Sequence, residues 1–169
     1  MKKLLVVIDM QNDFVYGSLG TGEARAILSN LREKLAQYRA QGDDVVFTRD
    51  THGEDYLSTQ EGKYLPIEHC IKDTDGWQIV EGLYAGEKVF DKPVFGSMEL
   101  AEFVSSNAYD EVALVGVCTD ICVLSNAVLI KTACPQIPVK VFKNCCAGVT
   151  QATHEAALTV LSSIQVEIL

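Results

Sequence analysis

The chain has 169 residues, 48% of them hydrophobic, so it is long enough to bury a core as one domain of residues 1–169. Its net charge of -9 and pI near 4.7 argue against nucleic acid and anionic membranes as partners, because both select basic surfaces. No apolar run could cross a bilayer, and the first one stops at Asp9, too short for a signal peptide. The six cysteines lack the spacing of a disulfide scaffold, so the sequence predicts a reduced, cytoplasmic protein.

Short apolar runs alternate with amphipathic segments along the whole chain. The runs that predict buried strands are Leu4–Ile8, Val45–Thr48, Lys88–Lys92, Val112–Val117, Val139–Phe142 and Val166–Leu169. Apolar residues at helical spacing predict helices over residues 24–38, 100–104, 119–134 and 150–161, and a short helix within 73–86. This alternation predicts an α/β fold of three layers, α/β/α, around a doubly wound, mainly parallel sheet of about six strands.

Chemically versatile side chains directly follow four of the predicted strands. They are Asp9, Asp50, Lys92 and Cys122. Taken singly, each has an ordinary structural explanation, since a lone lysine is usually solvated and a free cysteine is usually a small buried hydrophobe. The carboxyl ends of parallel strands, however, lie along one edge of a sheet, so we expect the four side chains to form one site.

Cys122 is the candidate nucleophile. It falls in the first turn of a helix that Thr119 and Asp120 are suited to start, just beyond a buried strand. The helix dipole and the unpaired backbone N–H groups of such a turn favour a thiolate. The same N–H groups could hold an oxyanion.

Two histidines and two carboxylates suggest a metal site. Asp50 and His52 lie two apart in an extended segment and so point to the same side, and Glu61 and His69 follow across a polar loop. Such a set suits zinc, iron or manganese, although the spacing also fits a solvated loop with incidental histidines. The third histidine, His154, falls in the first turn of the last helix and is expected to be a surface or packing residue.

Three segments of the chain resemble the isochorismatase-like cysteine hydrolase family, and within it most closely the nicotinamidases. They are Val6–Phe14 (Val-Val-Ile-Asp-Met-Gln-Asn-Asp-Phe), Asp91–Ser97 (Asp-Lys-Pro-Val-Phe-Gly-Ser) and Gly116–Val123 (Gly-Val-Cys-Thr-Asp-Ile-Cys-Val). The resemblance covers nearly the whole chain, and it implies the α/β fold that the alternation of strands and helices predicts.

The resemblance also implies roles for single residues. Asp9, Lys92 and Cys122 would form a catalytic triad, the peptide bond between Val117 and Cys118 would be cis, and the N–H groups of Cys118 and Cys122 would form the oxyanion hole.

The metal ligands and part of the substrate pocket are implied in the same way. Asp50, His52 and His69 would bind the metal, with Glu61 as a further ligand. The substrate pocket would include Phe14 and Gln11. Members of the family commonly assemble as homo-oligomers, and we expect the same here.

The resemblance implies hydrolysis of a small carboxamide, nicotinamide to nicotinate and ammonia, through a thioester on the cysteine. Metal-independent hydrolysis of a carbamoyl or ureido compound is an alternative, and so is the hydrolysis of a vinyl ether by isochorismatase itself, which needs no thiol nucleophile. A non-enzymatic alternative is a thiol redox or zinc-binding module built from Cys118, Cys122, Cys145 and Cys146. The spacing of these cysteines is unlike a redox Cys-x-x-Cys motif or a zinc knuckle.

Overall fold

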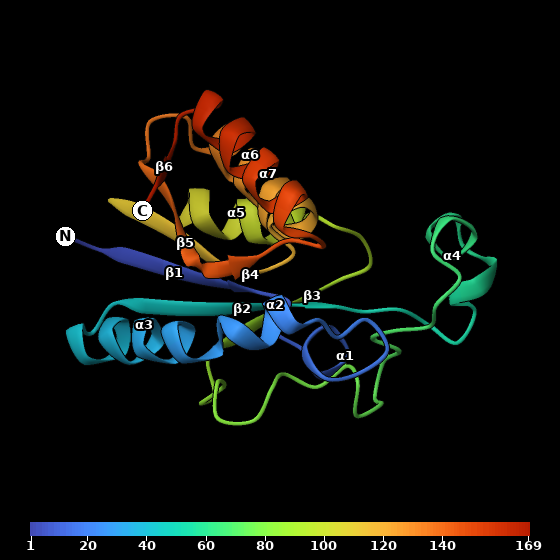
Figure 1. Cartoon of the computed structure of the whole chain (residues 1–169). Helices are drawn as coiled ribbons and strands as arrows, with labels where there is room; N and C mark the ends of the chain where they lie inside the picture. The colour runs from blue at the N-terminus through green and yellow to red at the C-terminus, as the bar shows by residue number, and fades with distance from the viewer.

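The computed structural model describes residues 1–169 and contains one six-stranded sheet between two layers of helices (Figure 1). The strands are β1 (Lys3–Ile8), β2 (Asp44–Asp50), β3 (Lys88–Lys92), β4 (Glu111–Val117), β5 (Val139–Ala147) and β6 (Val166–Ile168). Their order in the sheet is β3-β2-β1-β4-β5-β6, and every neighbouring pair is parallel. The predicted doubly wound sheet is therefore confirmed.

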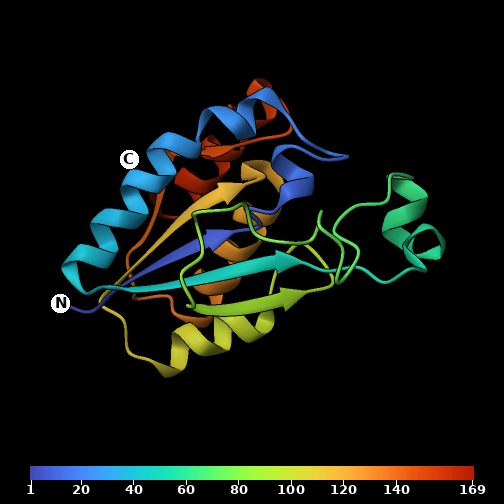
Figure 2. The same cartoon turned by 90° about the horizontal axis from the view of Figure 1, so that it is seen from below.

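The helices divide between the two faces of this sheet. They are α1 (Asn12–Val15), α2 (Gly22–Ala26), α3 (Leu28–Gln41), α4 (Gln60–Tyr64), α5 (Met98–Ser106), α6 (Leu124–Ala133) and α7 (Gln151–Ser163), with a 3-10 turn at Tyr56–Ser58 and a π-helical turn at Thr119–Val123. Helices α2 and α3 cover one face, and α5, α6 and α7 cover the other, whereas α4 projects beyond the end of the sheet (Figures 1 and 2). None of the helices is both long enough and apolar enough to cross a membrane.

The central strand β1 shows why its sequence is continuously apolar. Leu4, Val6 and Ile8 pack into the core beneath α5, α6 and α7, whereas Leu5 and Val7 pack into the core beneath α2 and α3. All five side chains are fully buried. A strand covered on both faces cannot alternate apolar with polar residues, so it appears in the sequence as an unbroken hydrophobic run.

The strand order reverses between β1 and β4, and this reversal positions the site. The chain leaves β1 towards α1, α2 and α3 on one face and leaves β4 towards α6 on the other (Figure 1). In such a sheet the two departing connections open a crevice beyond the carboxyl ends of the strands. Asp9 directly follows β1, and Cys118 directly follows β4.

The expected helix within residues 73–86 does not form. Trp77 and Val80 are buried, as anchors of this segment should be, but the backbone runs through turns. Its polar groups bond instead to the segment after β1, since the Val80 N–H donates to the Met10 carbonyl at 2.9 Å and the Gln78 carbonyl accepts from Asn12 at 2.9 Å. Apolar residues at helical spacing thus mark contact points of an irregular segment.

One strand boundary and one helix face also differ from the sequence predictions. Strand β5 continues past Phe142 to Ala147, because its second half pairs with β4 beyond an irregularity in the register. In α7 the helical spacing of apolar residues predicts that Ala156, Ala157, Val160 and Leu161 face inward. The structure buries Ala157, Leu158 and Leu161 and exposes Ala156 and Val160. Apolar residues occur on several sides of this helix, so the periodicity did not fix which side faces the core.

Candidate active site

The three residues of the predicted triad meet at the carboxyl edge of the sheet. Lys92 Nζ lies 2.6 Å from Asp9 Oδ2 and 3.4 Å from Cys122 Sγ. Asp9 is fully buried, Lys92 is 1% exposed and Cys122 is 6% exposed. The fold therefore gathers an acid, a base and a thiol from the ends of three different strands.

Thr48 on β2 fixes the carboxylate of Asp9. Its hydroxyl donates to Asp9 Oδ1 at 2.6 Å, and the Asp9 N–H contacts the same hydroxyl at 3.2 Å. Asp9 itself has φ of 48°, a left-handed conformation that aspartate tolerates better than most residues. Apart from the ion pair with Lys92, Asp9 Oδ2 accepts no hydrogen bond within the chain, so it is free to accept a proton.

Burial sets the protonation states of the triad. Burial raises the pKa of Asp9, although the Lys92 ammonium opposes this. Burial, followed by the charge of Asp9, raises the pKa of Cys122 well above its ordinary value. For Lys92, burial alone would lower the pKa, but the Asp9 carboxylate and its neighbours raise it. The resting site thus contains a charged lysine and a neutral thiol, because burial and the nearby carboxylates outweigh the charge of the single ammonium.

The segment leading to Cys122 has the backbone features of an anion site. The peptide bond between Val117 and Cys118 is cis, as the resemblance implies. Gly116 has φ of 116°, and a Cβ there would collide with the carbonyl oxygen of Ile8, so only glycine lets β4 approach β1 this closely. The N–H of Cys118 makes no hydrogen bond within the chain and is available to a substrate oxygen.

A buried asparagine joins the Lys92 segment to the Cys122 turn. Asn126 accepts from the Ser97 N–H at 3.0 Å and donates to the carbonyls of Phe95, at 3.1 Å, and Cys122, at 2.8 Å. Sequence reasoning assigned no role to Asn126 or to Thr48. The signal for Asn126 was present, since it is a polar residue at an apolar-face position of its helix.

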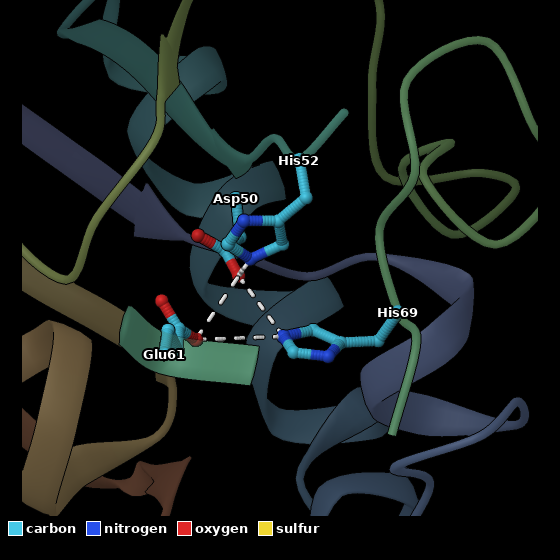
Figure 3. Close-up of side chains that lie close together, drawn as sticks. All are labelled: Asp50, His52, Glu61 and His69. Atoms are coloured by element: carbon cyan, nitrogen blue, oxygen red, sulfur yellow. Dashed lines mark hydrogen bonds and ion pairs between the residues drawn. The ribbon is translucent and has the colours of Figure 1, made fainter. Parts of the chain in front are cut away.

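Four candidate metal ligands also converge, with their polar atoms facing one another (Figure 3). Asp50 ends β2, His52 follows it, Glu61 lies on α4 and His69 lies in the loop beyond α4. His52 Nε2 lies 2.9 Å and His69 Nε2 lies 3.4 Å from Asp50 Oδ2, and each histidine nitrogen lies 3.8 Å from Glu61 Oε1. Tetrahedral ligands at about 2.1 Å from zinc stand about 3.4 Å apart, so the set fits such an ion.

Hydrogen bonding prepares His69 for ligation. Its Nδ1 lies 2.8 Å from the carbonyl of Ile67, which favours the tautomer with hydrogen on Nδ1 and a lone pair on Nε2. Burial alone would lower the pKa of His69, but the bonds to Asp50 and Ile67 raise it. Burial would raise the pKa of Asp50, yet hydrogen bonds from His52 and His69 hold it below its ordinary value. Asp50 is therefore an anionic ligand, as a divalent cation requires.

The structure places Gln11 away from the predicted substrate pocket. Its side chain is fully buried, accepts from the Asp50 N–H at 2.7 Å and donates to the carbonyls of Asp50, at 2.8 Å, and Trp77, at 2.9 Å. These bonds consume the amide, so Gln11 holds the backbone of a candidate metal ligand. Asp50 also contacts Lys92, with 3.5 Å between Oδ1 and Nζ, which joins the metal cluster to the triad.

One cavity of about 560 Å³ gives access to both groups. Phe14, Cys118 and Cys122 line it on the side of the triad, and Asp50, Glu61 and His69 line it on the side of the metal cluster. Three of its lining residues are exposed apolar side chains: Tyr64, Phe95 and Val149. Phe14 lines this cavity, whereas Asp9 and Lys92 contact Cys122 without lining the cavity themselves.

The sequence matches the isochorismatase domain family over residues 3–169. The chain belongs to the isochorismatase family. This confirms the resemblance on which the site residues were predicted. Among its relatives, an isochorismatase family protein of Bacillus subtilis is 34% identical over an alignment of 144 residues. The match covers 76% of this chain and 78% of the relative. A nicotinamidase/pyrazinamidase of Mycobacterium tuberculosis is 28% identical and matches 98% of this chain and 97% of its own length.

Solved structures share the fold over its full extent. The nicotinamidase/pyrazinamidase of Bacillus subtilis superposes with a TM-score of 0.88 at 28% identity, covering 99% of both chains. The pyrazinamidase of Pyrococcus horikoshii, solved in complex with zinc, has a TM-score of 0.88 at 26% identity and covers 100% of this chain and 99% of that one.

The cysteines do not support a redox or zinc-binding module. The one group of three or more potential ligands in the chain is Asp50, His52, Glu61 and His69, and it contains no cysteine. Cys145 and Cys146 pack into opposite cores of the sheet, as adjacent residues of a strand must.

Proposed function

We propose that this isochorismatase-family chain is a cysteine hydrolase that converts nicotinamide to nicotinate and ammonia. The observation that carries the proposal is the contact of one buried ammonium, Lys92, with both the Asp9 carboxylate and the Cys122 thiol behind a cavity that also reaches a metal cluster. The relatives named as nicotinamidases support a small aromatic carboxamide as the substrate.

In the first half of the reaction, Asp9 is the base and Cys122 the nucleophile. Asp9 Oδ2 takes the thiol proton, and Cys122 Sγ forms a bond to the carboxamide carbon. The N–H groups of Cys118 and Cys122 stabilise the negative oxygen of the tetrahedral intermediate. The C–N bond then breaks, and Asp9 returns the proton to the departing ammonia, leaving a thioester on Cys122.

In the second half, water replaces ammonia. Asp9 takes a proton from a water molecule that attacks the thioester carbon, the carbon–sulfur bond breaks, and Cys122 leaves as a thiol after regaining the proton. Lys92 remains charged throughout and balances whichever of its two anionic neighbours carries the negative charge, which its raised pKa permits.

Asp50, His52, Glu61 and His69 would hold a divalent metal, and the spacing of their donor atoms fits zinc. Iron and manganese accept the same donor types, but the zinc complex of the Pyrococcus horikoshii relative makes zinc the first choice. When bound, the metal supplies a Lewis acid that accepts a ring nitrogen or water and so orients the substrate. His69 and Glu61 both line the cavity, so a ligand of this site would lie beside Cys122.

We further propose a cytoplasmic, homo-oligomeric protein in which residues 1–169 form one domain. The six free thiols support a reducing compartment. Tyr64, Phe95 and Met98 are 84%, 42% and 63% exposed, and such large apolar side chains support an interface between subunits. The partners of the chain would then be its own copies and a small amide.

The test is ammonia release from nicotinamide by the purified protein, after metal removal and after addition of zinc, iron or manganese. We expect metal-dependent release that disappears in Cys122→Ala, which removes the nucleophile and only one sulfur of packing. A carbamoyl compound such as N-carbamoylsarcosine serves as the alternative substrate. Release from that compound alone, without dependence on metal, would reassign the substrate, and turnover in Cys122→Ala comparable to wild type would reject the mechanism.

A further inference from the structure

The third histidine, His154, is buried against the segment that carries the nucleophile. Its Nδ1 atom lies 2.8 Å from Thr119 Oγ1. Thr119 is fully buried and His154 is only 8% exposed, so of the surface or packing position expected from the sequence the structure shows the packing one, with an interior hydrogen bond. A second bond, from the Val149 N–H to Asp120 Oδ1 at 3.1 Å, joins the same two segments.

Thr119 occupies a decisive place in the backbone of the site. It follows Cys118, whose N–H is the proposed oxyanion donor, and it begins the π-helical turn Thr119–Val123 that contains Cys122. Threonine is stiff about χ1, so a fixed hydroxyl also fixes the orientation of its backbone. Anchoring Thr119 Oγ1 therefore restrains the two peptide groups that flank Thr119. The first of these is joined through the Cα of Cys118 to the peptide group that presents the Cys118 N–H, so it limits how that N–H can turn.

His154 is itself held firmly. The backbone N–H of His154 donates to the carbonyl of Thr150 at 2.9 Å, in the first turn of α7, which Thr150 caps with a capping box. Gly148 passes so close behind it that a Cβ at that position would lie 2.9 Å from the Cα and Cβ of His154. The backbone that carries the imidazole is thus fixed on α7, a helix that contributes nothing to the triad or the metal cluster.

We propose that His154 and Thr119 form a positioning pair that holds the Cys118–Cys122 segment in the geometry needed to bind the oxyanion. The inference rests on the proposed hydrolysis through Cys122. The pair does not touch the substrate cavity, so it acts through the backbone and not on the substrate itself. Because the oxyanion develops in the transition state, loss of the pair should lower kcat and leave KM nearly unchanged.

The chain offers matched substitutions at both positions. Thr119→Val keeps the branched shape and removes the hydroxyl, whereas Thr119→Ser keeps the hydroxyl. His154→Leu removes the imidazole, whereas His154→Asn has nearly the shape of leucine and places an amide group near the position of Nδ1. The double variant Thr119→Val/His154→Leu shows whether the two side chains act as one unit.

Each variant is assayed for ammonia release from nicotinamide, for thermal unfolding, and for alkylation of Cys122 by iodoacetamide. We expect Thr119→Val and His154→Leu each to lower kcat by about tenfold or more, with KM within about twofold, since misplacing an oxyanion donor costs rate and not ground-state binding. Thr119→Ser and His154→Asn should retain most of the activity, and the double variant should be no slower than the single ones. Alkylation should stay at the wild-type rate, because it develops no oxyanion.

Several results would overturn the positioning role. One is an equal loss of kcat in Thr119→Val and Thr119→Ser, and another is a loss in the double variant equal to the product of the two single losses. A third is a lower melting temperature of Thr119→Val and His154→Leu with unchanged kcat, which would show that the hydrogen bond serves stability alone. A wild-type protein that releases no ammonia under any metal would instead overturn the proposed function, and this role with it.

Discussion

Replacing Asp9 by asparagine should change turnover and thiol reactivity in opposite directions. Asparagine keeps an oxygen for the Thr48 hydroxyl, which lies 2.6 Å from Asp9 Oδ1, so the local structure should survive. Turnover requires Asp9 as a base and should fall by at least about 100-fold. The thiol of Cys122, however, loses the neighbouring charge that raises its pKa, and it should become more acidic.

The distances within the triad set the size of this effect. Lys92 Nζ lies 2.6 Å from Asp9 Oδ2 and 3.4 Å from Cys122 Sγ, which limits how far apart the carboxylate and the sulfur can be. Two unit charges about 6 Å apart interact by about 3 kcal/mol at an effective dielectric constant of about 20. This energy corresponds to about 100-fold more thiolate, and the lower nucleophilicity of a more acidic thiol cancels about half of the gain on a logarithmic scale. The net expectation is alkylation about tenfold faster than in wild type.

The assay follows alkylation of Cys122 by iodoacetamide from neutral to alkaline pH, with modified peptides identified by mass spectrometry. Wild type and Asp9→Asn are compared in the same metal state, and Cys134, remote from the triad, provides an internal reference. The rate profile of the variant should lie at lower pH than that of wild type. Slower alkylation in the variant, or an unshifted profile, would refute the electrostatic reasoning, and undiminished turnover would refute the assignment of Asp9 as the base.

Three further predictions concern the metal cluster and its support. Gln11→Leu should lower the free energy of unfolding by about 2–4 kcal/mol in urea denaturation, because it leaves buried backbone groups of Asp50 and Trp77 unpaired; an unchanged midpoint would contradict this. In a chelator competition assay, His69→Ala should weaken zinc binding at least about 100-fold and Glu61→Gln about tenfold. Equal zinc affinities for wild type and both variants would show that zinc does not bind at this cluster. Zinc affinity should fall as the pH falls through the raised pKa of His69, since the protonated ring cannot ligate, and a flat profile across mildly acidic pH would contradict that role.

The sheet, and the edge of it that carries the site, were predictable because the apolar runs in the sequence coincide with the strands that the structure buries. The strand Lys88–Lys92 was predicted with the bounds that the structure shows. The sequence alone groups Asp9, Lys92 and Cys122, since each lies at or beyond the end of a strand and parallel strands end at one edge of the sheet. Site residues that follow strands directly can thus be predicted from the sequence of an α/β protein.

The supporting contacts were not predictable in this way. Thr48, Asn126 and His154 act through partners distant in the chain, and no local periodicity records such pairs. Gln11 and Phe14 belong to one motif, yet Phe14 lines the cavity whereas Gln11 lies in the interior, because the chain turns at α1. Side-chain direction after a strand depends on tertiary contacts, and these are absent from the sequence pattern.

The central claim, that Cys122 becomes acylated, is tested most directly by trapping the intermediate. The zinc-loaded protein is mixed with nicotinamide, quenched in acid at short times, and its peptides are analysed by mass spectrometry. The account predicts a nicotinoyl group on Cys122 that appears before steady state and is absent in Cys122→Ala. Steady ammonia release with no adduct on Cys122 at any time, or with an adduct on another residue, would contradict it.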